Sequence, residues 1–235
     1  MNGSQLQYFP VSLPFLLLFW GLLIVLIALA ALRLLKYASI SMGISERALI
    51  GILGLSLLGS YINIRLGYLP GHRTVTTGAI SFFGMTYIVP IVREGHGTVL
   101  AINIGGAIIP ICLSLYLLFK HRLFLLGAVG TLFVAVVCHF LAQPVPGFGI
   151  ALPIFVPAVA TAIIAVALSR RRAAPLAYIS GSLGTLIGAD LLNLGAVQSL
   201  GAPVASIGGA GTFDGIFVTG LLAVLWAGLS RYLHD

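Results

Sequence analysis

Charged residues are scarce in this sequence. Of its 235 residues, 7% are Asp, Glu, Lys or Arg, and only five of these are acidic. A soluble domain carries about 25% charged residues, so this chain lacks the polar groups needed to cover a surface in water. Apolar residues make up 60% of the chain, which also excludes an intrinsically disordered protein. The remaining class is a polytopic membrane protein, here a single integral membrane domain over residues 1–235.

Cysteine and nucleotide-binding or nucleophile motifs are also scarce. The two cysteines, Cys112 and Cys138, both fall inside apolar segments, where thiols commonly pack as small apolar side chains. The sequence contains no phosphate-binding loop, serine nucleophile elbow or cysteine cluster. We therefore expect no cofactor.

Apolar segments are abundant. Crossing about 30 Å of hydrocarbon takes about 20 apolar residues in a helix. Seven windows meet this requirement: 12–35, 46–64, 98–119, 122–143, 149–169, 175–198 and 211–232. Ser45 followed by Glu46 is a capping signal for the second window. The predicted fold class is therefore an all-α polytopic membrane protein with about seven transmembrane helices.

The distribution of Lys and Arg predicts the orientation. With the N-terminus outside, three cations fall on the outer side: Arg65, Arg73 and Arg93. Nine fall on the inner side: Arg33, Lys36, Arg47, Lys120, Arg122, Arg170, Arg171, Arg172 and Arg231. Cytoplasmic loops are the Lys- and Arg-rich ones, so we predict the N-terminus outside and the C-terminus inside, in the cell membrane. The net charge of +7 then reflects contact with the lipid bilayer, and we expect no nucleic-acid partner.

One long connection, residues 65–97, falls on the outer side. Its apolar part, Phe83–Val92, precedes the polar turn Arg93–Gly97 and the apolar Thr98–Ala101. This order predicts a short hairpin on the outer surface. A re-entrant segment is the alternative, because about 14 apolar residues are too few to span the membrane.

Two short strings repeat along the chain. Gly106–Ile111 resembles Gly149–Ile154, and Gly130-Thr-Leu132 matches Gly184-Thr-Leu186. Because both occur in the same order, we predict a weak parallel repeat of residues 98–143 and 149–198. Three prolines, Pro110, Pro153 and Pro157, are expected to interrupt the third and fifth helices and to leave room for water or a ligand.

Only two acidic residues fall inside predicted spans, Asp190 and Asp214. Ionisable groups in a bilayer cost several kcal/mol unless paired or hydrated, so both are candidate functional residues. Counted along the helices, both lie near the outer face. Supporting polar residues at the same depth are Asn103, His139 and Asn193, and the flanking backbone positions are Gly188, Gly208, Gly209, Gly211, Gly215 and Pro153.

Two carboxylates close together in a low-dielectric site share a proton, so that one acts as base and the other as acid. This is the chemistry of an aspartyl hydrolase. The string Gly211-Thr-Phe-Asp214-Gly-Ile-Phe217 resembles the Gly-x-Gly-Asp motif of the presenilin and signal peptide peptidase intramembrane proteases. The resemblance implies catalytic roles for Asp190 and Asp214 and a membrane-embedded peptide as substrate. Phe213 replaces the second glycine of the motif, and the Pro-Ala-Leu motif is missing after Asp214.

A closer resemblance covers Gly184–Asn193 and Gly208–Phe217. These strings resemble a family of small prokaryotic multi-pass membrane proteins of unknown function, which implies no activity. Two alternatives to the hydrolase therefore stay open. The same acids can serve a proton- or cation-coupled transporter or channel that moves a small solute or ion. His139, Asp190 and Asp214 can also form an intramembrane divalent-metal site, although their spacing matches no metal motif.

Overall fold

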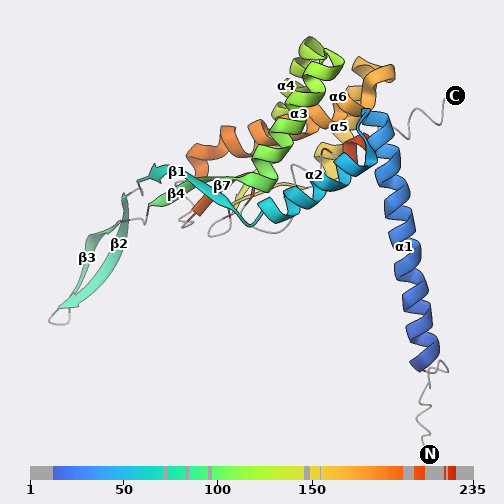
Figure 1. Cartoon of the computed structure of the whole chain (residues 1–235). Coiled ribbons are helices and arrows are strands. Elements are labelled where there is room, and N and C mark those ends of the chain that lie inside the picture. Colours follow the sequence, from blue (N-terminus) through green and yellow to red (C-terminus); the bar gives the residue numbers. More distant parts are fainter. Residues whose placement is uncertain are drawn as a thin grey trace, which may run out of the picture.

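The computed structural model describes residues 13–70, 73–82, 85–94, 97–145, 149–153, 155–197, 204–209, 220 and 222–225. Helices dominate, and short strands lie at one end of the helical bundle (Figure 1). Four described segments are long and apolar enough to cross a membrane: Leu16–Met42, Ile104–His121, Phe124–Leu141 and Arg170–Ala196. The composition and length of these helices agree with the predicted membrane protein.

The first helix, α1 (Leu13–Met42), stands apart from the bundle over most of its length (Figure 1). Its 30 residues make a rod of about 45 Å at 1.5 Å per residue. Among residues 16–42, the buried ones are confined to its C-terminal end: Ala38, Ser39 and Met42. The helix ends at Met42, and the next residue, Gly43, has a left-handed φ of 69°, which favours glycine.

Helix α2 (Glu46–Gly59) begins as the sequence predicts and ends early. The Ser45 side chain accepts a hydrogen bond from the N–H of Ala48 at 3.3 Å, which caps the first turn. The helix has 14 residues, about 21 Å, which is less than the hydrocarbon thickness. The last part of the predicted window 46–64 leaves the helix and enters a strand.

Three strands form a small sheet that we call the sheet end: β1 (Asn63–Leu69), β4 (Thr98–Asn103) and β7 (Val204–Ile207). Their order is β1-β4-β7, with β1 antiparallel and β7 parallel to β4. Between β1 and β4, strands β2 (Arg73–Phe82) and β3 (Met85–Glu94) form a separate antiparallel pair. Strands β5 (Gln143–Val145) and β6 (Gly149–Ala151) form a third, shorter pair.

These strands correct the prediction of an all-α protein with one hairpin. A hairpin does lie within residues 65–97, but Phe82 pairs with Met85, so its turn precedes the predicted Arg93–Gly97. The two predicted arms, Phe83–Val92 and Thr98–Ala101, fall in strands β3 and β4, but β3 pairs with β2 and β4 pairs with β1 and β7. The predicted third helix also begins at residue 98, where the structure has strand β4. Residues Thr98–Asn103 satisfy their backbone groups on both β1 and β7, a tertiary pairing that outweighs their apolar helical pattern.

The bundle consists of α3 (Ile109–His121), α4 (Phe124–Leu141), α5 (Phe155–Leu168) and α6 (Ala173–Thr185). Helix α6 is central, because it packs against the other three and every residue from Ala173 to Ser182 is buried. The 3-10 turn η2 (Arg170–Arg172) precedes α6. Three short segments follow it: the π-turn η3 (Leu186–Asp190), the 3-10 turn η4 (Leu191–Asn193) and the short helix α7 (Leu194–Val197).

The prolines lie where helices start. The π-turn η1 (Ile104–Ile108) joins β4 to α3, and Pro110 lies in the first turn of α3. Since proline cannot donate a backbone hydrogen bond, the widened turn accommodates it, in agreement with the expected interruption. In the fifth window, the helix begins at Phe155, so Pro157 lies in its first turn and Pro153 precedes it. Instead of interrupting the helix, the two prolines therefore lie before and within its first turn, and the helix begins later than the predicted window.

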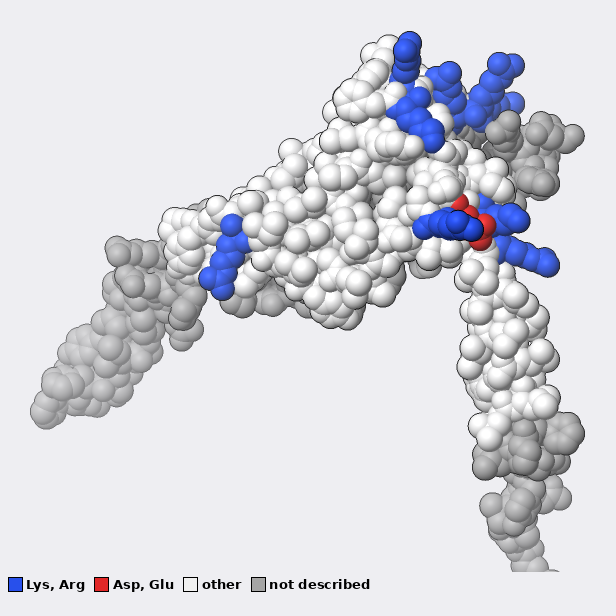
Figure 2. Space-filling model, viewed as in Figure 1, with Lys and Arg blue, Asp and Glu red and all other residues white. Residues whose placement is uncertain are grey.

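The turns between the helices meet at the opposite end from the sheet, and we call this region the cationic end. The Lys120 ammonium donates to the carbonyl of Gly43, Nε2 of His121 lies 3.1 Å from the Met42 carbonyl, and Arg172 Nη1 donates to the His121 carbonyl at 2.9 Å. Lys and Arg side chains gather at and near this end (Figure 2). Its cations are Arg33, Lys36, Arg47, Lys120, Arg122, Arg170, Arg171 and Arg172.

These eight are all of the predicted inner cations except Arg231, which lies outside the described residues. Of the predicted outer cations, Arg65 lies in β1 and Arg73 and Arg93 lie in β2 and β3. The structure thus separates the two sets of cations, as the sequence predicts. The side of the membrane that each end faces stays a prediction.

Candidate functional site

The candidate site centres on Asp190, the last residue of the π-turn η3. Its Oδ2 accepts a hydrogen bond from the N–H of Gly208 at 2.8 Å, which ties the end of α6 to the turn after β7. The side chain is partly buried within a candidate membrane-spanning segment. Within the described ranges, no Lys, Arg or His forms an ion pair with it.

Gly208 is required at this position for two reasons. Its φ of 86° lies in the left-handed region, as does that of Gly209 at 84°. A Cβ on Gly208 would also lie 2.7 Å from the backbone nitrogen of Ala107 in η1. The absence of a side chain therefore lets the turn after β7 approach η1 and present its N–H to Asp190.

The π-turn η3 determines which way Asp190 faces. In a regular α-helix at 3.6 residues per turn, Asp190 would lie about 120° around the axis from Tyr178. A π-turn adds one residue and rotates the subsequent residues back by about 100°, to within about 20° of Tyr178. Asp190 then shares a face of α6 with three buried hydroxyl residues, Tyr178, Ser182 and Thr185, which we call the hydroxyl stripe.

The hydroxyl stripe lies between α6 and neighbouring segments. The Thr185 hydroxyl is 3.6 Å from the Cys138 thiol of α4. Farther along, a Cβ on Gly220 would lie 2.5 Å from Ser182 Oγ and 3.3 Å from the Tyr178 ring. The helical residues at the C-terminal end of the chain, 220 and 222–225, thus begin against this stripe.

Close approach of α4 and α6 holds the π-turn in place. A Cβ on Gly188 would lie 2.2 Å from the Ala135 carbonyl oxygen, so only glycine allows this backbone contact. Nearer the start of both helices, a Cβ on Gly184 of α6 would lie 2.6 Å from Val134 Cβ, and one on Gly130 of α4 would lie 2.2 Å from Ser180 Oγ. Later residues of α4 meet later residues of α6 and η3, so the two helices run parallel. Glycines of both helices lie at their contacts, as in tightly packed membrane helices.

The two predicted asparagines have different partners. Asn193 Nδ2 donates to the carbonyls of Gly188 and Ala189 at 2.8 and 3.0 Å, and so satisfies backbone groups of the π-turn itself. Asn103, at the end of β4, is 1% exposed. Its Nδ2 donates to the Ser60 carbonyl at 2.7 Å, and its Oδ1 accepts from the N–H of Gly106 at 2.8 Å.

Asn103 is linked to Asp190 through backbone. It caps η1, and η1 packs against Gly208, the donor to Asp190. Asn103 Nδ2 also donates to Asn63 Oδ1 at 3.0 Å, and that oxygen accepts from Ser206 Oγ of β7 at 2.6 Å. The two polar side chains, Asn103 and Asp190, therefore fasten the π-turns η1 and η3 to the sheet end.

Other predicted site residues lie elsewhere. His139 is exposed on α4, with its ring centroid 6.0 Å from that of Phe140. Pro153 is exposed between β6 and α5. Asp214, Gly211 and Gly215 lie outside the described residues, so the pairing of the two aspartates stays a prediction. Within the described part of the chain, no three His, Cys, Asp or Glu side chains gather as a metal site would require.

The hydroxyl stripe is the feature that the sequence prediction missed. Tyr178, Ser182 and Thr185 are spaced four and three residues apart, which places them on one helical face. This spacing is the pattern from which the stripe could have been predicted. Asp190 is five residues beyond Thr185, and only the π-turn brings it onto the same face.

Comparison with known protein families gives a match. The model of the family described as "Protein of unknown function (DUF1614)" matches residues 57–226. No curated protein and no solved structure matches the chain. The match agrees with the predicted resemblance to a family of unknown function. The predicted resemblance to presenilin and signal peptide peptidase finds no support in these comparisons.

Proposed function

The chain belongs to the family described as "Protein of unknown function (DUF1614)", and we propose that it is a proton- or cation-coupled transporter or channel whose ion-binding group is Asp190. The observation that supports this proposal is the position of the Asp190 carboxylate. It lies in a candidate membrane-spanning segment, on the same helical face as the hydroxyl stripe.

A carboxylate in such a place needs compensation. Gly208 supplies one hydrogen bond, to Oδ2, and among the described residues there is no cationic partner. A carboxylate has about four acceptor sites, so Asp190 retains capacity for a proton or a metal cation. Acidic residues inside membrane-spanning segments commonly mark ion pathways and proton relays.

The hydroxyl stripe supports a path leading away from Asp190. Each hydroxyl can both donate and accept a hydrogen bond, as a relay of protons or a series of cation ligands requires. Tyr178, Ser182 and Thr185 extend along α6 from Asp190 at the sheet end toward Arg172 at the cationic end. From the positive-inside rule, we place the sheet end outside and the cationic end inside. Asp190 is then the outer entrance of the path.

Flux into proteoliposomes tests the proposal. Liposomes containing the purified protein and a trapped pH-sensitive dye are exposed to a pH gradient, and parallel samples to a Na⁺ gradient. We expect flux of one of these ions in the wild type and only the protein-free leak with Asp190→Asn. The amide oxygen of asparagine can still accept from Gly208, so this variant keeps the structural hydrogen bond while losing the charge.

Two further variants separate the path from general packing. Thr185→Val removes a stripe hydroxyl at almost constant volume and should lower the flux. Ser114→Ala removes a buried hydroxyl that lies on α3 and is not part of the stripe on α6, and it should leave the flux unchanged. Equal flux in the wild type and Asp190→Asn, or a wild type that conducts neither ion, would disprove the proposal.

An intramembrane aspartyl hydrolase is the second candidate, and one observation favours it. Gly208, six residues before Asp214, donates to Asp190, and Gly220, six residues after Asp214, lies against Ser182 of α6. A panel of single-span peptides in detergent tests this candidate. Cleavage that disappears in both Asp190→Asn and Asp214→Asn would establish the hydrolase, whereas flux that requires Asp190 but not Asp214 would establish the transporter.

A further inference from the structure

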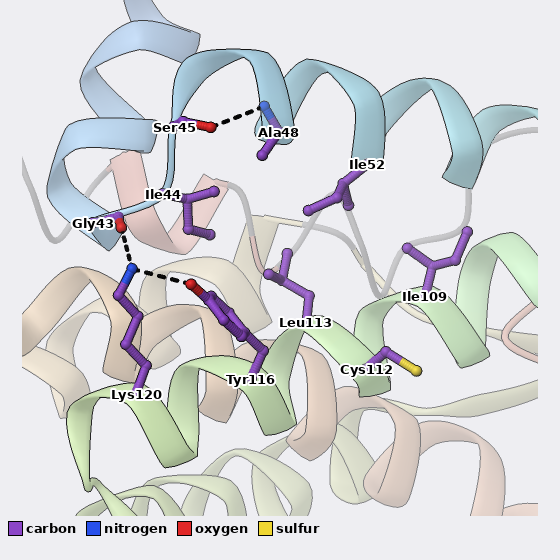
Figure 3. Close-up of a pocket in the computed structure, with 10 residues that line it drawn as sticks. All are labelled: Gly43, Ile44, Ser45, Ala48, Ile52, Ile109, Cys112, Leu113, Tyr116 and Lys120. Carbon is purple, nitrogen blue, oxygen red and sulfur yellow. Dashed lines mark hydrogen bonds between the residues drawn. The ribbon is translucent and has the colours of Figure 1, made fainter.

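A groove separates α2 from α3 next to the cationic end. Its volume is about 570 Å³, which is in the range of small-molecule sites. Figure 3 shows side chains of both helices pointing into it. Most of its wall is apolar: Ile44, Ala48, Ile52, Ile109 and Leu113. Because Ala48 on one wall and Cys112 on the other are exposed, the groove is open along its side.

The polar groups of the groove are concentrated at one end. Lys120 donates to the carbonyl of Gly43 and to the hydroxyl of Tyr116, the latter at 3.2 Å (Figure 3). Its ammonium group also lies 5.2 Å from the centroid of the Tyr116 ring. An ammonium group has three donors, so one remains for a ligand. Lys120 is exposed, so this donor is accessible from the groove's open side.

The surroundings of Lys120 are strongly positive. The eight described cations of the cationic end include Arg47 on α2 and Arg122, the residue directly after α3. Glu46 is the single acidic side chain of the described residues at this end, where Figure 2 shows red beside blue. A ligand that combines an apolar chain with a negative head group complements both parts of the groove.

We propose that this groove holds one anionic phospholipid of the surrounding bilayer. An acyl chain lies along Ala48, Ile52 and Leu113, and the head-group phosphate accepts a hydrogen bond from Lys120. The site is at the cationic end, which the positive-inside rule assigns to the inner leaflet. The proposal is independent of Asp190, which lies at the sheet end.

Native mass spectrometry of the full chain, released from mild detergent with defined lipids, tests this site. Phosphatidylglycerol and phosphatidylcholine with the same acyl chains are offered in equal amounts. We expect one phosphatidylglycerol to be retained in preference to phosphatidylcholine. Lys120→Met should reduce that preference about fivefold, the effect of about 1 kcal/mol per cation near an anionic surface, and Lys120→Arg should preserve it.

Matched controls separate the groove from the general positive charge. Arg171→Ala removes an exposed cation of the same end that does not line the groove, and it should leave the preference unchanged. Ala48→Trp fills the groove from an exposed position and should abolish retention of both lipids. Leu55→Trp places the same ring on an exposed part of α2 outside the groove, and this variant should retain lipid as the wild type does.

Three outcomes would overturn the proposal. Equal retention of the two lipids by the wild type would show that the head group is not recognised. Equal losses from Lys120→Met and Arg171→Ala would show diffuse attraction without a site. A lipid-free dimer that Ala48→Trp dissociates would show that a second copy of the chain occupies the groove.

Discussion

The candidate membrane-spanning segments Leu16–Met42 and Arg170–Ala196 have the same length and opposite surroundings. In the most apolar 18-residue stretch of the first, none of the residues is buried, whereas 72% of the corresponding stretch in the second is. The exposed segment is the more apolar of the two. The buried one contains the hydroxyl stripe, Gly188 and Asp190.

This difference shows that the apolar character of a membrane helix reflects its exposure to lipid more than its burial in protein. Leu18 and its neighbours on α1 are exposed, and only an apolar side chain is stable against lipid. Helix α6 is surrounded by protein, where small residues permit close approach and polar groups find partners. The less apolar helix is therefore the core of the fold, and matched substitutions on the two helices should have unequal effects.

Shortening a leucine should distinguish the two helices most strongly. Leu176 on α6 is fully buried, so Leu176→Ala leaves a cavity that should cost about 2–5 kcal/mol of unfolding free energy. Leu18 on α1 is 69% exposed, and Leu18→Ala should cost less than about 0.5 kcal/mol. Unfolding in detergent mixtures, followed by circular dichroism, measures both. Equal losses would mean that α1 is packed against a partner.

A methyl group added to a glycine tests the close approach. Gly188→Ala places a Cβ 2.2 Å from the Ala135 carbonyl oxygen, so α4 and α6 must separate, at a cost of about 1–3 kcal/mol. Gly21 on α1 has nothing within 4 Å of the added atom, and Gly21→Ala should be neutral or stabilising. The same unfolding measurement applies. A neutral Gly188→Ala would contradict the close approach of α4 and the π-turn at Gly188.

A double-mutant cycle examines one contact of that packing. Gly130→Ala places a Cβ 2.2 Å from Ser180 Oγ and 3.1 Å from its Cβ, and should cost about 1–2 kcal/mol. Because the nearer clash involves the hydroxyl, Gly130→Ala combined with Ser180→Ala should recover part of the loss. Additive effects would show that the two residues do not touch.

Replacing two buried serines should give the smallest difference in stability among these comparisons. Ser56 Oγ donates to the Gly105 carbonyl at 2.6 Å, and Ser56→Ala should cost about 0.6 kcal/mol, a typical interhelical hydrogen bond in membranes. Ser114 Oγ has no hydrogen-bond partner among the described residues, so Ser114→Ala should be neutral or slightly stabilising. Thermal denaturation compares the two variants directly. The opposite order would indicate that Ser114 binds a water molecule.

Four of the seven predicted windows overlap described segments that are long and apolar enough to cross a membrane, because helix length there is set by hydrocarbon thickness. Helices α2 and α5, with 14 residues each, are shorter than their windows. The limits of α4 at Phe124 and Leu141 lie within two residues of the predicted window 122–143. The strand pairing was not predictable. The sequence left Thr98–Ala101 as either the start of a helix or part of a hairpin, and pairing with β1 and β7, distant in sequence, makes it a strand.

For the candidate site, the sequence predicted the acidic residue but not its hydrogen-bond donor or its orientation. Asp190 stands out because no other described acid lies within a candidate span. Its donor Gly208 and the rotation of its side chain toward Thr185 depend on a left-handed turn and on a π-turn. The hydroxyl stripe joins the site only after that rotation, because α-helical spacing alone points Asp190 elsewhere.

By itself, the sequence determined the class of protein, the apolar helices and the separation of cations into two sets, since all three depend on the cost of placing charge and open backbone in lipid. The tertiary structure decided which helix lies at the centre and which polar groups meet. Those properties depend on glycines such as Gly188 and Gly208, whose effect is visible only once the segments that approach them are in place. Close packing is a relation between distant residues, and no local pattern encodes it.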